Sequence, residues 1–129
     1  MKGSTNYRHE NSPLLVKGEK FAARIIRMVQ YLEKNNKYAA KPLLNQILRS
    51  GTSIVANIGE SQFAQTPADF VTKLHISLKE ANETRRWLNV FYAAEYTTAK
   101  EHESMSKDLS EIIAILISSI NTIKRNQLK

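Results

Sequence analysis

The chain has 129 residues, of which 42% are hydrophobic and 24% charged, and it carries a formal net charge of +7. This length and composition are typical of one folded domain with a hydrophobic core. The absence of cysteine excludes disulfides, thiolate catalysis and zinc-thiolate sites. A membrane-spanning helix is also excluded, because the longest apolar run covers only residues 112–117 and a span needs about twenty. We therefore expect a cytoplasmic protein.

The first half of the chain predicts a flexible polar arm over residues 1–12 and two helices within a single domain over residues 13–129. Ser12 followed by Pro13 is typical of a helix N-cap with proline in the first turn. Apolar residues then recur at intervals of three and four until Asn35-Asn36-Lys37 ends the helix. Pro42 fits only the first turn of a second helix, which runs to about Gln62.

The second half of the chain predicts two more helices. Thr66-Pro67 repeats the start signal for a third helix, which runs to about Glu95, and Thr98 and Glu101 have the spacing of a capping box that opens a fourth. Short connections between four long helices make chain neighbours antiparallel. The sequence therefore predicts an all-α protein, an antiparallel up-down-up-down four-helix bundle.

The fourth helix has more apolar surface than one bundle core requires. Its isoleucines and Leu116, between Ile112 and Ile123, cover an arc of about 200°, whereas a core-facing stripe needs about 100°. Exposed apolar surface on a soluble protein usually marks an interface, so this surplus predicts a homo-oligomer. The alternative is a thick core with a few exposed isoleucines.

Positive charge gathers near the start of the chain. Residues 1–49 hold ten basic and three acidic residues, which accounts for the whole net charge. On the first helix a group of bases with one tyrosine shares an arc of about 100° that points away from the apolar stripe. Such a face can neutralise phosphates and stack on a base, and the alternative is a solvated basic face. The candidate nucleic-acid contacts are Lys17, Lys20, Arg24, Arg27, Tyr31 and Lys34.

Catalytic and cofactor motifs are scarce. His9, His75 and His102 lie far apart and have no second ligand at metal spacing. Glu80 and Glu83 form a possible carboxylate pair on the third helix but lack a neighbouring histidine. The four glycines form no phosphate-binding loop. We therefore expect no enzymatic activity, no metal and no cofactor.

A polar line on the second helix is the most informative pattern. It has a three-four-four-three spacing and consists of Gln46, Arg49, Ser53, Asn57 and Glu60. A line of small residues, Thr52, Ala56 and Gly59, runs beside it and would let another helix approach closely. In a hairpin about residues 64 and 65, Arg49 falls opposite Glu80, with Glu83 about one turn away. This predicts a buried ion pair with Ser53 and Asn57 also buried, in preference to a ligand site.

The segment from Arg49 to Glu60, RSGTSIVANIGE, resembles the signature of a bacterial four-helix-bundle family, the 23S rRNA-intervening sequence proteins. Gln46 before it, Asp69-Phe70, the stretch of residues 78–84 and Trp87-Leu88 extend the resemblance over about residues 14–127. The resemblance implies antiparallel bundles that assemble as five-fold rings, some of them encoded within insertions in 23S rRNA genes. The chain is similar also to the accessory variability proteins of diversity-generating retroelements, which are basic pentamers that bind nucleic acid and a reverse transcriptase.

Two functions therefore remain open. The first is a non-enzymatic homo-oligomer, expected to be a pentamer, that associates with RNA or DNA through its basic helix. The second is an oligomeric scaffold that binds a reverse transcriptase or another protein, with the positive charge serving solubility. The family resemblance favours a structural role for Gln46, Arg49, Ser53, Asn57, Glu60, Glu80 and Glu83.

Overall fold

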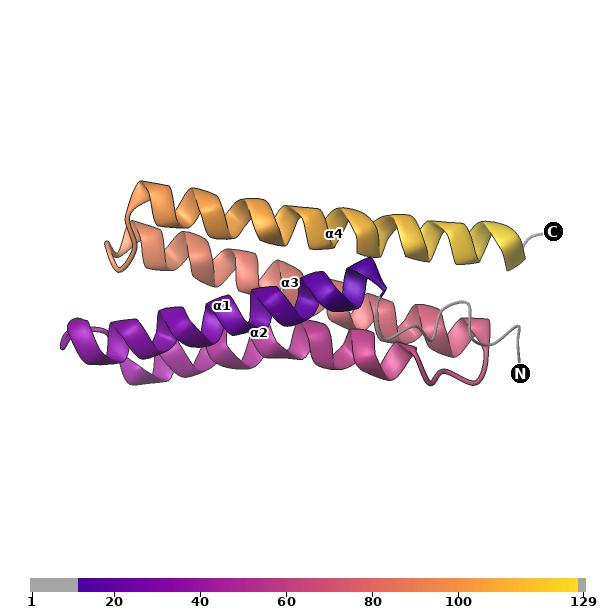
Figure 1. The fold of residues 1–129 in the computed structure, drawn as a ribbon, viewed down its shortest axis with the longest axis horizontal. Helices are drawn as coiled ribbons and strands as arrows, with labels where there is room; N and C mark the ends of the chain where they lie inside the picture. The colour runs from indigo at the N-terminus through magenta and orange to yellow at the C-terminus, as the bar shows by residue number, and fades with distance from the viewer. Residues whose placement is uncertain (1–11, 128–129) are drawn as a thin grey trace.

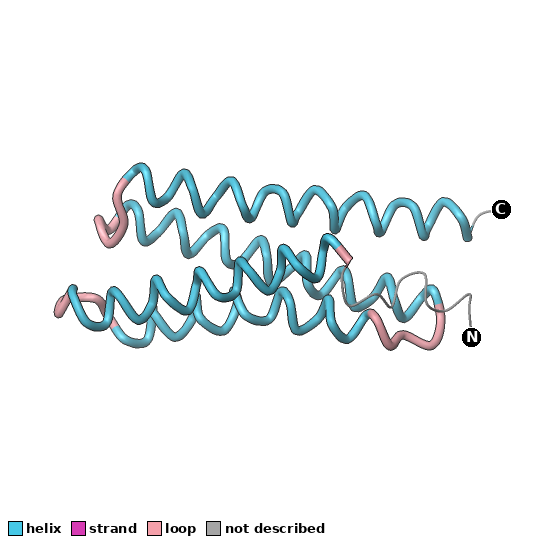
Figure 2. The backbone as a smooth tube through the Cα atoms, in the orientation of Figure 1, coloured by secondary structure: helices cyan, strands magenta, loops and turns pink. Residues whose placement is uncertain are grey.

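The protein is a four-helix bundle in the computed structural model, which describes residues 12–127. In chain order the helices are α1 (Pro13–Asn35), α2 (Lys41–Ser61), α3 (Pro67–Ala93) and α4 (Ala99–Gln127). They lie along one long axis, each antiparallel to the next, and short loops alternate between the two ends (Figures 1 and 2). The predicted all-α up-down-up-down architecture is confirmed. Of the predicted arm, residues 1–11 lie outside the described residues.

Predicted side-chain caps fix the starts of α1, α3 and α4, whereas the start of α2 has no side-chain cap. Ser12 and Thr66 precede α1 and α3, and each side-chain oxygen accepts a hydrogen bond from the backbone N–H three residues further on, at 3.1 and 3.0 Å. At the start of α4 the capping box is complete. Thr98 N–H donates to Glu101 Oε1 at 2.8 Å, and Glu101 N–H donates to Thr98 Oγ1 at 3.1 Å. These bonds satisfy backbone donors that a helix leaves free in its first turn.

The residues that follow α3 connect the α3–α4 loop to the α1–α2 loop at one end of the bundle. Glu95 has a φ of 64°, and the N–H groups of Tyr96 and Glu95 donate to the carbonyls of Phe91 and Tyr92, which is a Schellman motif. The Phe91 and Tyr96 rings pack with their centroids 5.2 Å apart. The Tyr96 hydroxyl then accepts a hydrogen bond from Ala40 N–H at 3.0 Å. The α3–α4 loop is thereby tied to the α1–α2 loop.

Glycine sets the distance between α1 and α2. A Cβ on Gly51 would lie 2.9 Å from Ile25 Cγ1, and one on Gly18 would lie 3.1 Å from a methyl of Val55. The two helices therefore pack closer than any side chain at Gly51 would permit. The expected close approach along Thr52, Ala56 and Gly59 is wrong, because a Cβ at Gly59 would meet nothing within 4 Å.

The core absorbs most of the apolar arc of α4. Ile112, Leu116 and Ile120 are buried, and Ile113, Ile115 and Ile123 are partly buried against the core. Ile117 is the exception, at 44% exposed. The apolar surplus expected from the sequence is therefore smaller than its arc of about 200° indicates, because residues at the edges of the stripe pack against the core.

The seam between α1 and α4 is the loosest of the four. Each helix contacts its two neighbours around the bundle, and the α1–α4 contact is the least extensive. Figure 1 shows α4 continuing past the start of α1, so the two helices overlap over only part of their lengths. Within residues 12–127 no helix combines the length and apolarity that crossing a membrane would require.

Candidate functional site

The basic face of α1 comprises Lys17, Lys20, Arg24, Arg27 and Lys34, with Tyr31 among them. Two of its cations are paired with α4. Lys17 Nζ lies 3.2 Å from Glu111 Oε1, and Arg24 binds Asp108 while also donating to Ser104 Oγ at 3.0 Å. The face is therefore partly neutralised by its own bundle.

Arg24 departs most from the sequence prediction. Both Arg24 and Arg27 were expected to point well away from the core, but the Arg24 side chain is only 32% exposed and reaches across the α1–α4 seam. It does so because Asp108 and Ser104 lie one turn apart on the facing side of α4. Arg27 is exposed, as expected. Arg24 therefore contributes to holding the seam.

The remaining cations of the basic face are available to a ligand. Lys20, Arg27 and Lys34 are exposed and make no ion pair with any residue in the described part of the chain. Tyr31 is 62% exposed. These groups combine positive charge with an accessible aromatic ring, which is the pairing that single-stranded nucleic acid favours.

The α1–α2 loop extends this surface, and the sequence reasoning missed it. Tyr38 is 81% exposed, and the Lys37 ammonium lies 5.3 Å from the centre of its ring. Lys41 is exposed at the start of α2. The signal in the sequence is the Lys37-Tyr38 pair in the turn after Asn36, which lies outside the helical periodicity.

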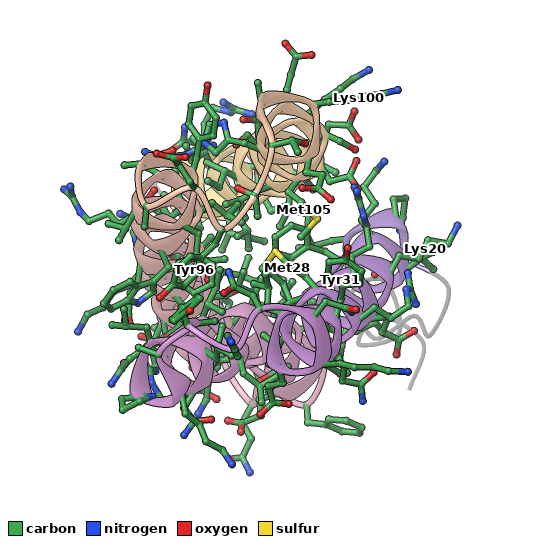
Figure 3. All side chains as sticks on the ribbon, turned by 90° about the vertical axis from the view of Figure 1, so that its left-hand side faces the viewer. Lys20, Met28, Tyr31, Tyr96, Lys100 and Met105 are labelled. Atoms are coloured by element: carbon green, nitrogen blue, oxygen red, sulfur yellow. The ribbon has the colours of Figure 1, made fainter. Side chains whose placement is uncertain are left out.

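A pocket of about 360 Å³ opens at the same end of the bundle. It lies in the loose seam between α1 and the start of α4, and the α3–α4 loop closes its third side. Figure 3 shows Met28 and Met105 turned toward each other across the space between the helices, with Tyr31 and Tyr96 on either side. The lining residues are Arg24, Arg27, Met28, Tyr31, Leu32, Tyr96, Thr97, Glu101 and Met105. Three separate chain segments build it, so no local pattern could reveal it.

The predicted contact between α2 and α3 is present. Arg49 donates to Glu80 Oε1 at 3.0 Å and also binds Glu83, whose carboxylate accepts a second hydrogen bond from Trp87 Nε1 at 3.2 Å. The bond from Arg49 lowers the pKa of Glu83, and the same bond raises the pKa of Arg49. The Arg49 side chain is 50% exposed, so the prediction of a buried ion pair is wrong.

The rest of the polar line on α2 lies nearer the surface than expected. Ser53 and Asn57 are half-buried, and Asn57 Nδ2 donates to the Ser53 carbonyl at 2.9 Å within the same helix. The prediction that both are buried is wrong, because their line flanks the apolar stripe. Gln46 is exposed, and Glu60 pairs with Lys73 at 2.8 Å.

Other hydroxyls take the buried positions between α2 and α3. Ser77 Oγ donates to the Ile54 carbonyl at 2.8 Å, and Thr84 Oγ1 lies 2.9 Å from Ser50 Oγ. All three hydroxyl side chains are buried within the apolar stripes of their helices. Together with the Arg49 ion pairs, these bonds fix the register of the α2–α3 hairpin.

The histidines lie apart from one another. His75 is exposed, and His102 stacks on Tyr92 with 4.8 Å between ring centroids while its Nε2 lies 2.8 Å from Asn89 Oδ1. His9 lies outside the described residues. Over residues 12–127 no three metal-binding side chains gather in one place.

Fold and surface define an all-α bundle with exposed cations on α1 and an aromatic-lined pocket at one end. Residues 10–118 match the model of the 23S rRNA-intervening sequence protein, and the chain belongs to this family. It is similar to a crystal structure from Bacteroides thetaiotaomicron, described as a protein with unknown function from the S23 ribosomal protein family. The two chains are 45% identical with a TM-score of 0.79, over 84% of this chain and 95% of the other. Among curated proteins no sequence matches this chain.

Proposed function

We propose that this protein is a non-enzymatic, cytoplasmic homo-oligomer that binds the backbone of RNA or DNA through the basic face of α1. The observation that carries the proposal is that Lys20, Arg27 and Lys34 are exposed beside the exposed ring of Tyr31 and form no ion pair within residues 12–127. A cation without an intramolecular partner gives up no ion pair when it binds a phosphate. It also releases condensed counterions from the nucleic acid, which favours binding.

Lys17 and Arg24 contribute less to this interface. Each is held by a carboxylate of α4, so a phosphate must compete with Glu111 or Asp108 for it. Oligomerisation strengthens the interface, because a five-fold ring repeats the free cations and concentrates positive potential on one assembly.

The test measures fluorescence anisotropy of labelled single-stranded and duplex oligonucleotides over a series of salt concentrations. Affinity should fall with salt at a log-log slope of about −0.7 per phosphate contact on a single strand and about −0.9 on a duplex. The double variant Lys20→Glu/Arg27→Glu should bind at least tenfold more weakly. Arg24 is left intact, since a glutamate there would face Asp108 and disturb the bundle.

The matched control is Lys79→Glu/Arg86→Glu, which makes the same change in net charge at two exposed positions of α3. It should bind almost as well as the wild type. If the wild type binds neither RNA nor DNA at low salt, or if both double variants lose affinity equally, the basic face is not the interface.

A protein scaffold is the second candidate. It is favoured by exposed apolar side chains outside the basic face, Phe63, Val90 and Tyr92. Under this alternative the partner is a reverse transcriptase or another protein, and the positive charge serves solubility. Failure of nucleic-acid binding in the test above would favour it.

A further inference from the structure

The pocket in the α1–α4 seam has an apolar floor and polar walls. Met28, Leu32 and Met105 supply the floor, and the rings of Tyr31 and Tyr96 lie on either side (Figure 3). Methionine adapts its shape and makes favourable contacts with aromatic rings. A volume of about 360 Å³ is near the lower end of the range for small-ligand sites. The pocket therefore suits one flat ring system rather than an extended cofactor.

The lining also carries charged side chains, so the pocket can bind more than an apolar molecule. Glu101 uses Oε1 to cap α4, and its second oxygen has no hydrogen-bond partner in the part of the chain that the structure describes. Arg27 is exposed and belongs to the same lining.

We infer that this pocket receives one unpaired base of a single-stranded nucleic acid, with an adjoining phosphate on Arg27. The inference rests on the proposed function and adds that the bound nucleic acid is single-stranded. A base offers an aromatic face to Tyr31 and N–H donors to the carboxylate of Glu101, and the adjoining phosphate offers a negative charge to Arg27. A stacked, paired base in a duplex cannot enter, so the pocket discriminates in favour of single strands.

The surrounding surface can carry the strand beyond the pocket. Lys34 lies about one turn after Tyr31 and about two turns after Arg27 on α1, and Lys37 and Lys41 follow through the α1–α2 loop. Cations spaced in this way track a backbone while one base is held. The pocket and the basic face therefore form one continuous site.

The experiment compares a single-stranded 12-mer RNA with the duplex of the same sequence, using Tyr31→Ala and its matched control Phe63→Ala. Phe63 is an exposed aromatic residue that lies outside both the basic face and the pocket lining. We expect Tyr31→Ala to weaken single-strand binding about tenfold, because stacking on one ring is lost, and to leave duplex binding within twofold. Phe63→Ala should change single-strand binding by less than threefold. The DNA 12-mer is run in parallel to determine which sugar is preferred. A Tyr31→Ala variant that binds the single strand as tightly as the wild type would overturn the inference.

The outcomes also separate this inference from the proposed function. If the wild type binds with the expected salt dependence but binds duplex as tightly as single strand, the pocket is not used and the basic face alone stands. If Lys20→Glu/Arg27→Glu and the wild type both fail to bind any oligonucleotide, the proposed function and the pocket assignment are both wrong.

Discussion

For Arg49 the sequence predicts the ion-pair partners correctly but not the exposure of the side chain. Antiparallel helix geometry sets which residues of α2 and α3 face each other, so the pairing with Glu80 and Glu83 follows from the loop position alone. Its burial does not follow, since an arginine has a long stem and its head reaches the surface. The sequence therefore predicts the partner, and only the structure gives the exposure.

Arg49→Ala should lower the free energy of unfolding by about 1–2 kcal/mol, because a half-exposed pair contributes less than a buried one and two pairs are lost. Glu80, at 15% exposed, is then left with a carboxylate lacking its cation. The measurement is urea denaturation. Arg86→Ala is the exposed control and should change the free energy of unfolding by less than about 0.5 kcal/mol, as is usual at surface sites. A loss of about 3–5 kcal/mol in Arg49→Ala would restore the buried-pair interpretation.

Glu83 makes this contact depend on pH. Its pKa is lowered in the folded protein, first by the hydrogen bond from Arg49, so on acidification the unfolded chain takes up this proton before the folded one does. The contribution of Glu83 is therefore complete above the unfolded pKa of about 4.3 and is lost as pH falls through the lower folded value. Glu83→Gln should be less stable than the wild type at pH 7, and the difference should shrink below pH of about 4. A difference that stays constant from pH 7 to pH 3 would contradict the prediction.

At the scale of the helices, the sequence predicts the capping residues at helix starts better than it predicts which polar side chains of a helix are buried. Ser12, Thr66 and the Thr98–Glu101 box act on backbone groups within one turn, so sequence spacing alone determines them. The polar line on α2 depends instead on how far the helix is rotated about its axis. A rotation that buries Ser50 necessarily leaves Ser53 at the flank, and sequence periodicity does not resolve that difference.

The glycines of α2 give a matched test of helix packing. Gly51→Ala should destabilise the fold by about 1–3 kcal/mol, because its Cβ would lie 2.9 Å from Cγ1 of the fully buried Ile25. Gly59→Ala meets nothing within 4 Å and should stabilise the helix by up to about 1 kcal/mol. Chemical denaturation of the two variants compares one substitution at two sites of one helix. Equal changes in stability would show that α1 and α2 do not pack as closely as described.

At the scale of the whole molecule, the pocket illustrates what sequence reasoning lacks. Tyr31, Thr97 and Met105 come from three segments that meet only because α1 and α4 close the bundle. Their meeting point is open because the α1–α4 contact is the least extensive of the four. The residue pattern of a single helix does not determine how closely α1 and α4 pack against each other.

The oligomeric state is the last prediction at this scale. Ile26, Ile76, Val90 and Ile117 remain 38–45% exposed on the bundle, and association would remove part of this apolar surface from water. Static light scattering should therefore give several times 14.7 kDa, with a pentamer as the expected species. Ile117→Glu should lower the measured mass, because a carboxylate cannot enter an apolar interface without a partner.

Lys20→Glu/Arg27→Glu serves as the control for assembly, since the proposed function places the basic face outside the interface between copies. Its mass should equal that of the wild type, and its circular dichroism should show the same helical content. A wild-type monomer across micromolar concentrations would contradict assembly. A double variant that dissociates would instead place the basic face within the interface, where its cations could not reach a phosphate.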